Sequence, residues 1–149
     1  MTTPPSLRPL AGFALGCLAT AALFAAAGSP AWLKSGVFRW EDVKFVPGKT
    51  GQRAQVIDLP TGTLSKLHCH ISLLNPGENT GALHRHPQEE LIVVKEGTLE
   101  VNFDGRKQTA GPGALVFFSV NENENMTNVG AAPAVYYVFQ WFTPLTPKG

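Results

Sequence analysis

The sequence contains only four histidines, and they occur as two His-x-His pairs. These pairs are His68 with His70 and His84 with His86. On a β-strand, side chains two residues apart point to the same face, so each pair would present two imidazoles together. Neutral imidazole is the most common protein ligand for transition metals. The two pairs are therefore the first candidates for metal chemistry.

Glu90 follows the second pair at a spacing that keeps it on the same face. His84, His86 and Glu90 are all even-numbered, and Pro87 bends the chain only modestly. Two imidazoles and a carboxylate that face one cavity form a facial triad, which suits iron(II) or manganese and leaves positions open for substrate or dioxygen. Taken alone, a His-x-His pair is more typical of an exposed polar strand. The surrounding sequence must decide between the two interpretations.

Short strand-like segments separated by turn sequences occupy the chain from residue 37 onward. Charged residues make up 15% of the sequence, against 15 Gly and 12 Pro, which favours tight turns over long helices. We therefore expect an all-β sandwich or barrel. We also expect 91–95 and 98–103 to form a hairpin around Glu96-Gly97, because glycine readily supplies a positive φ. The predicted strands are 43–46, 55–59, 64–74, 91–95, 98–103, 107–110, 114–118 and 134–142.

Residues 1–30 have the pattern of an export signal. After Arg8, residues 10–27 carry no charge, are rich in Ala, Leu and Phe, and end in small residues. This predicts either a cleaved signal peptide or an uncut membrane anchor. Both outcomes indicate an exported protein, periplasmic or extracellular. We expect contact with a membrane only if the N-terminal segment stays uncleaved.

Charge and cysteine content exclude several classes of function. Twelve basic residues against eleven acidic ones give a net charge of +1 with no run of like charge, so no nucleic-acid partner is expected. Signal cleavage would remove Cys17 and leave Cys69 alone, which rules out an intrachain disulfide. We expect Cys69 to be a small buried residue and not a reactive thiol.

The stretch around the second histidine pair resembles the first conserved motif of the cupin superfamily. His84-Arg85-His86, three further residues, Glu90, six further residues and then Gly97 reproduce the order and spacing of that motif. The similarity extends over residues 38–142 and resembles small exported bacterial cupins. It implies one cupin barrel of the double-stranded β-helix, jelly-roll-like type, and a homodimer.

The second cupin motif is only partly matched, between Gly113 and Asn128. Glu124 stands where the family has its metal-binding histidine. Three interpretations remain open: Glu124 is a fourth ligand, it points to water and leaves three protein ligands, or the site has decayed. In the first case the set is His84, His86, Glu90 and Glu124, a hard and anionic set that favours manganese or iron(II).

The first histidine pair lies within a predicted strand. Residues 68, 70, 72 and 74 would share one face, and the more apolar residues 67, 69, 71 and 73 would share the other. His70 either enters the cavity, as a ligand or as a group that orients one, or lies on an exposed face. We expect His68 on the exposed face.

Two functional classes follow from the resemblance. One is a metal-dependent enzyme, an oxygenase in particular, that acts on a small organic molecule. The other is a cupin that binds or senses a ligand without catalysis and without a functional metal. No residue besides the candidate ligands stands out as a general base, so no catalytic residue is assigned.

Overall fold

The computed structural model describes residues 31–147, and nearly all of its regular elements are β-strands. The signal peptide or anchor predicted for residues 1–30 lies outside the described residues. No helix within residues 31–147 has the length and apolar character needed to cross a membrane. The elements are η1 (Trp40–Asp42), β1 (Val46–Pro47), β2 (Gln52–Leu59), β3 (Lys66–Leu74), β4 (Glu89–Glu96), β5 (Leu99–Phe103), β6 (Arg106–Ala110), β7 (Leu115–Phe118), β8 (Glu124–Asn128) and β9 (Ala134–Phe142).

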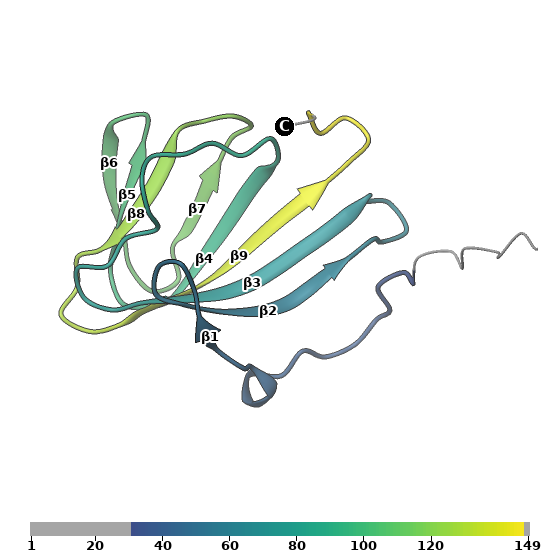
Figure 1. Ribbon diagram of the computed structural model, residues 1–149, viewed down its shortest axis with the longest axis horizontal. Coiled ribbons are helices and arrows are strands. Elements are labelled where there is room, and N and C mark those ends of the chain that lie inside the picture. The colour runs from purple at the N-terminus through teal and green to yellow at the C-terminus, as the bar shows by residue number, and fades with distance from the viewer. Residues whose placement is uncertain (1–30, 148–149) are drawn as a thin grey trace, which may run out of the picture.

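The strands form two antiparallel sheets. The larger sheet has the order β1-β2-β3-β9-β4-β7, and the smaller has the order β6-β5-β8. Figure 1 shows β5, β6 and β8 at one end of the fold and β2 and β3 at the other, with β9 and β4 between them. The expected all-β class is confirmed.

Strand alternation places the core between the two sheets. In β4 the residues Glu90, Ile92 and Val94 are buried, while their neighbours along the strand are more exposed. In β4 this period of two buries one face of the strand against the facing sheet, and burial of apolar area is the main stabilising contribution. The apolar core comprises Leu74, Ile92, Val94, Leu99, Val101, Ala110, Val116, Phe118, Met126, Ala134, Tyr136 and Val138.

The prediction of a hairpin around Glu96-Gly97 is wrong. β4 pairs with β7 and β9, whereas β5 pairs with β6 and β8, so the chain crosses from one sheet to the other at Gly97. Gly97 has a φ of +82°, and a Cβ placed on it would lie 2.5 Å from the Cα of Ala134. Glycine is required here for a close crossing and not for a two-residue hairpin turn. The register of Glu90 is fixed by β7 and β9 instead.

β8 was not predicted from the sequence, because it begins within the polar run of residues 121–125. Its inward positions are Glu124, Met126 and Asn128, all buried. The side-chain amide of Asn128 donates to the carbonyls of Leu74 and Ala132, each at 2.9 Å, and its oxygen accepts from the amide of Gly130. Polar residues are stable in this strand because the backbone around them satisfies their hydrogen bonds.

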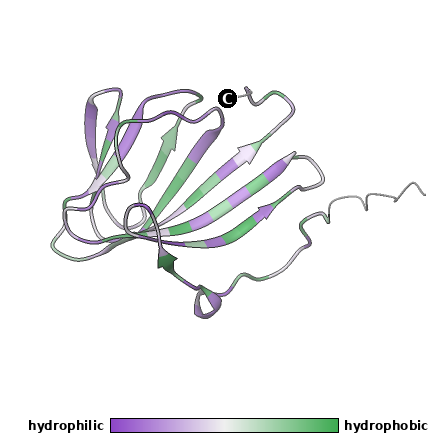
Figure 2. Cartoon of the chain, viewed as in Figure 1, coloured by the Kyte–Doolittle hydropathy of each residue, from purple (hydrophilic) through white to green (hydrophobic). Residues whose placement is uncertain are grey.

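Residues on both faces of β3 are buried, and the two faces differ in polarity, as its alternating hydrophilic and hydrophobic bands in Figure 2 show. His68 and His70 face the inside of the fold, whereas Cys69 and Ile71 line a hollow on the outside with Phe38. Cys69 is 3% exposed, and burial raises the pKa of its thiol to about 11.

We expect Cys69 to resist alkylation in the folded protein. At neutral pH a buried thiol of raised pKa supplies almost no accessible thiolate. Iodoacetamide should leave the Cys69 peptide unmodified under native conditions and modify it fully in urea, as measured by peptide mass spectrometry. Rapid native labelling at Cys69 would contradict this assignment.

Candidate functional site

The backbone brings His84 opposite Glu124. His84 lies in the loop before β4, where its amide donates to the carbonyl of Glu124 at 3.1 Å and its carbonyl accepts from the amide of Glu124 at 2.8 Å. The carbonyl of His86 accepts a third bond, from the amide of Asn121. His84 and His86 are therefore held by backbone hydrogen bonds to Glu124 and Asn121, at and before the start of β8. The two histidines are not part of a regular strand.

Three side chains converge at this bridge. Oε1 of Glu124 lies 2.9 Å from Nε2 of His84 and 3.1 Å from Nε2 of His86. One ligand atom from each residue lies within 4.8 Å of the other two. Glu124 is only 2% exposed, so its carboxylate does not point to water. The bond to Glu124 is the main reason why the pKa of His86 is raised.

Glu90 lies beside this group and is not part of its closest set. Its Oε2 is 3.9 Å from Nε2 of His86, and the side-chain amide of Gln140 on β9 donates to it. Burial, with the nearby charge of Glu124, raises the pKa of Glu90. Of the four predicted ligands, the structure brings His84, His86 and Glu124 together and places Glu90 next to them.

The donor set fits a divalent cation. It consists of two imidazoles and one carboxylate, a combination that transition metals of intermediate hardness accept. Nδ1 of His84 lies 3.0 Å from the carbonyl of Ala82. Because a carbonyl only accepts, Nδ1 carries a proton, and Nε2, the nitrogen on the side of Glu124 and His86, is the one that a metal would coordinate. A backbone contact thus orients the His84 ring as metal-binding histidines require.

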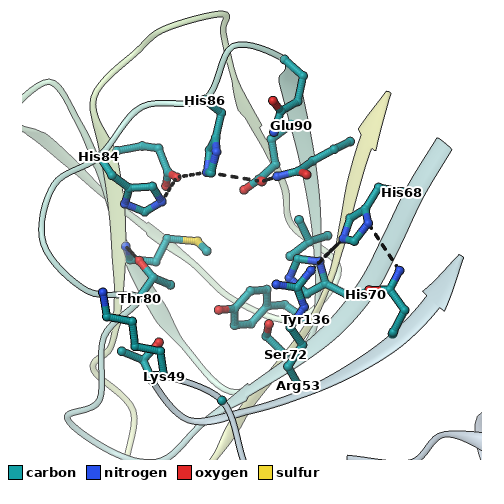
Figure 3. Close-up of a pocket in the computed structure, with 18 of the residues that line it drawn as sticks. Lys49, Arg53, His68, His70, Ser72, Thr80, His84, His86, Glu90 and Tyr136 are labelled. Carbon is teal, nitrogen blue, oxygen red and sulfur yellow. Dashed lines mark hydrogen bonds and ion pairs between the residues drawn. The ribbon is translucent and has the colours of Figure 1, made fainter. Parts of the chain in front are cut away.

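The group opens into a cavity of about 590 Å³. Figure 3 shows His84, His86 and Glu90 along one wall, with Lys49 and Arg53 on the opposite side of the view. The hydroxyl-bearing residues Ser72, Thr80 and Tyr136 also line it. A polar cavity of this volume has room for a small organic molecule.

His68 is not on an exposed face, contrary to the expectation. It is 7% exposed and lines the cavity together with His70. Its Nδ1 lies 3.0 Å from Oδ1 of Asp58, and its Nε2 lies 2.9 Å from Nδ1 of His70. His70 does enter the cavity, but it does not belong to the group formed by His84, His86 and Glu124.

The cavity residues on β2 were also not predicted from the sequence. The cavity is lined by Arg53, Gln55 and Asp58. In a regular strand, Asp58 would face the opposite side from Arg53 and Gln55, because side chains alternate between the two faces. The pairing of β2 with β3 shifts between Gln55 and Ile57, which marks a β-bulge. The extra residue of the bulge shifts the alternation of all later side chains in β2 by one, so Asp58 lies on the same inner side as Arg53. No sequence pattern indicated this bulge.

The family comparison decides the affiliation of this chain. Residues 70–140 match the model of the cupin domain family. Residues 70–140 are a domain of the cupin superfamily. No curated protein matches the sequence of this cupin.

Solved structures share the fold of this cupin. The polyketide cyclase RemF from Streptomyces resistomycificus is 22% identical, with a TM-score of 0.60 over 73% of this chain and 80% of its own. A cupin-superfamily sugar phosphate isomerase from Silicibacter pomeroyi is 24% identical, with a TM-score of 0.57 over 73% and 77%. A predicted oxalate decarboxylase from Thermotoga maritima is 16% identical, with a TM-score of 0.57 over 72% and 99%. These similarities establish the fold and leave the reaction open.

Proposed function

We propose that this cupin binds one divalent metal through His84, His86 and Glu124, with Glu90 beside them, and holds a small organic molecule in the adjoining cavity. The observation that carries the proposal is the convergence of three ligand atoms within 4.8 Å at the wall of a 590 Å³ cavity. Manganese or iron(II) is favoured, because one or two carboxylates make the set harder than one of histidines alone.

Titration of the metal-depleted protein with manganese(II) or iron(II) tests the metal site. We expect one metal per chain and, in pulsed electron paramagnetic resonance of the manganese form, coupling to nitrogens of two imidazoles. A protein that binds no metal, or binds it without imidazole coupling, would refute the assignment. The Glu122→Gln variant is a matched control, because Glu122 lies close by in sequence but outside the group.

For the reaction class we propose a metal-dependent oxygenase. The bound metal would supply a Lewis acid and a redox centre, and three protein ligands leave positions open for a substrate and a small gas molecule. The residues of the chain orient the substrate in the cavity and exclude bulk water. Nitric oxide, a dioxygen analogue, should bind the iron(II) form and produce its characteristic paramagnetic signal. The absence of that signal in an iron-loaded protein would exclude this class.

The alternative is a cupin that binds a ligand without catalysis. One observation favours it: Nε2 of His86 lies 3.1 Å from Oε1 of Glu124, within hydrogen-bond distance, so these two side chains can contact each other directly without a metal. A protein that binds no metal yet binds an organic ligand would support this function.

Export and dimerisation are further proposals. The uncharged segment 10–27 supports export to the periplasm or the outside of the cell. Exposed apolar side chains on the larger sheet, including Leu115 and Phe117, support a homodimer. N-terminal sequencing of secreted protein and analytical ultracentrifugation test the two proposals separately.

A further inference from the structure

The cavity wall opposite the metal ligands carries a hydrogen-bond chain whose direction is determined by Arg53. A guanidinium can only donate, and an NH₂ nitrogen of Arg53 lies 2.8 Å from Nε2 of His68. Nε2 of His68 must therefore accept, and the proton of this ring lies on Nδ1, where it is donated to Asp58. Because Nε2 of His68 has no proton, Nδ1 of His70 donates to it as well, and the single lone pair of Nε2 is shared by the two donors.

This chain leaves the second nitrogen of His70 as an acceptor. With its proton on Nδ1, the ring presents the lone pair of Nε2, and no hydrogen bond to that atom occurs among residues 31–147. No buried side-chain nitrogen in the described chain lacks a partner, so Nε2 of His70 is open to the cavity. Burial and the charge of Arg53 lower the pKa of His70 to about 3, so the ring stays neutral.

The charges of the cavity favour an anion. Three carboxylates and three cationic side chains line it, so their formal charges cancel until a divalent metal adds two positive charges. Lys66 lies 3.3 Å from Asp58. Within residues 31–147, Arg53 and Lys49 form no ion pair, and both remain available to a ligand. The carboxylates are Asp58, Glu90 and Glu124, and the cations are Lys49, Arg53 and Lys66.

We propose that the ligand of this cavity is a small hydroxylated organic anion. Its carboxylate or phosphate binds Arg53 and Lys49, a neighbouring hydroxyl donates to Nε2 of His70, and its other end faces the metal group. An NH₂ nitrogen of Arg53 and Nδ1 of His70 lie 2.8 and 2.9 Å from the same atom, Nε2 of His68, so the two side chains are neighbours on one wall and one end of a ligand can reach both. This inference rests on the proposed metal site for the excess positive charge.

Calorimetric titration of the manganese-loaded full chain with four probes tests the proposal. L-Malate carries the hydroxyl and the charge, succinate lacks the hydroxyl, butane-1,2,4-triol lacks the charge, and glycerol 3-phosphate replaces carboxylate with phosphate. We expect malate or glycerol 3-phosphate to bind about tenfold to a hundredfold more tightly than the triol. Malate should also bind more tightly than succinate if the carboxylate is preferred. The tighter of the two hydroxylated anions identifies the anionic group.

Substitution of Arg53 assigns the binding to this wall. Arg53→Gln should abolish the preference for anions over the triol, Arg53→Lys should keep part of it, and the exposed control Arg106→Gln should keep all of it. Equal affinity for the anions and the triol in the parent protein would overturn the proposal. An equal loss of the preference for anions in Arg53→Gln and Arg106→Gln would overturn it as well.

Two further measurements keep the outcome decisive. Metal content, determined first for each variant, separates failure of the metal site from failure of the anion site. If the parent protein takes up no manganese, the same titrations are carried out on the metal-free protein. Anion binding that depends on Arg53 would then still support the inference. Nitrogen-15 NMR of the parent should show His70 with an unprotonated Nε2, whereas a proton on that atom would refute the acceptor role.

Discussion

Replacing Glu124 by Gln is expected to lower the affinity for manganese(II) by about two orders of magnitude. The amide keeps the shape of the side chain but removes the negative charge that lies 2.9 and 3.1 Å from the two imidazoles. Loss of a group that only orients a metal ligand already costs about 10–100-fold, and Glu124 is proposed as a ligand itself. Competition with a fluorescent chelator measures the change.

Two carboxylates serve as controls for this prediction. Glu122→Gln should leave the affinity unchanged, and Glu90→Gln should reduce it by only about tenfold, the lower end of the range for a group outside the ligand set. Circular dichroism should confirm the fold of each variant. A Glu124→Gln protein that binds manganese as tightly as the parent would remove Glu124 from the ligand set, and a comparable loss in Glu90→Gln would add Glu90 to it.

Replacing Gly97 by Ala is expected to destabilise the protein by about 2–5 kcal/mol. A positive φ costs a non-glycine residue about 1–2 kcal/mol, and overpacking costs about 1–3 kcal/mol more. The new Cβ would lie 2.5 Å from the Cα of Ala134 and 2.9 Å from the carbonyl oxygen of Pro133. These are backbone atoms, so the clash cannot be relieved by a change of rotamer. Urea denaturation measures the free energy of unfolding.

Gly113→Ala provides a matched control. Gly113 has a φ of +85°, nearly that of Gly97, but no atom lies within 4 Å of the position its Cβ would take. Its substitution should cost only the backbone contribution of about 1–2 kcal/mol. Equal destabilisation by the two substitutions would show that the crossing at Gly97 is not tightly packed.

Strands with strong alternation or clear turn signals could be predicted from the sequence. The segment 134–142 coincides with β9 because its apolar and aromatic run lies after Gly130 and ends before Pro144. β8 could not be predicted, because Glu124 and Asn128 are polar and lie in a segment without an apolar alternation. Their burial is favourable only because His84 and the carbonyls of Leu74 and Ala132 supply partners from distant parts of the chain.

The same distinction applies to the site. The sequence by itself determined the cupin affiliation, the all-β class and the closeness of His84 to His86, because each depends on residue types at short spacing. Only the tertiary structure decided that Glu124 lies between these imidazoles, through the backbone bridge from His84 to β8. It also decided that Asp58 shares a face with Arg53, because a bulge in β2 reverses the alternation. Local patterns encode which face a residue occupies along one strand, whereas pairing between strands decides which faces meet.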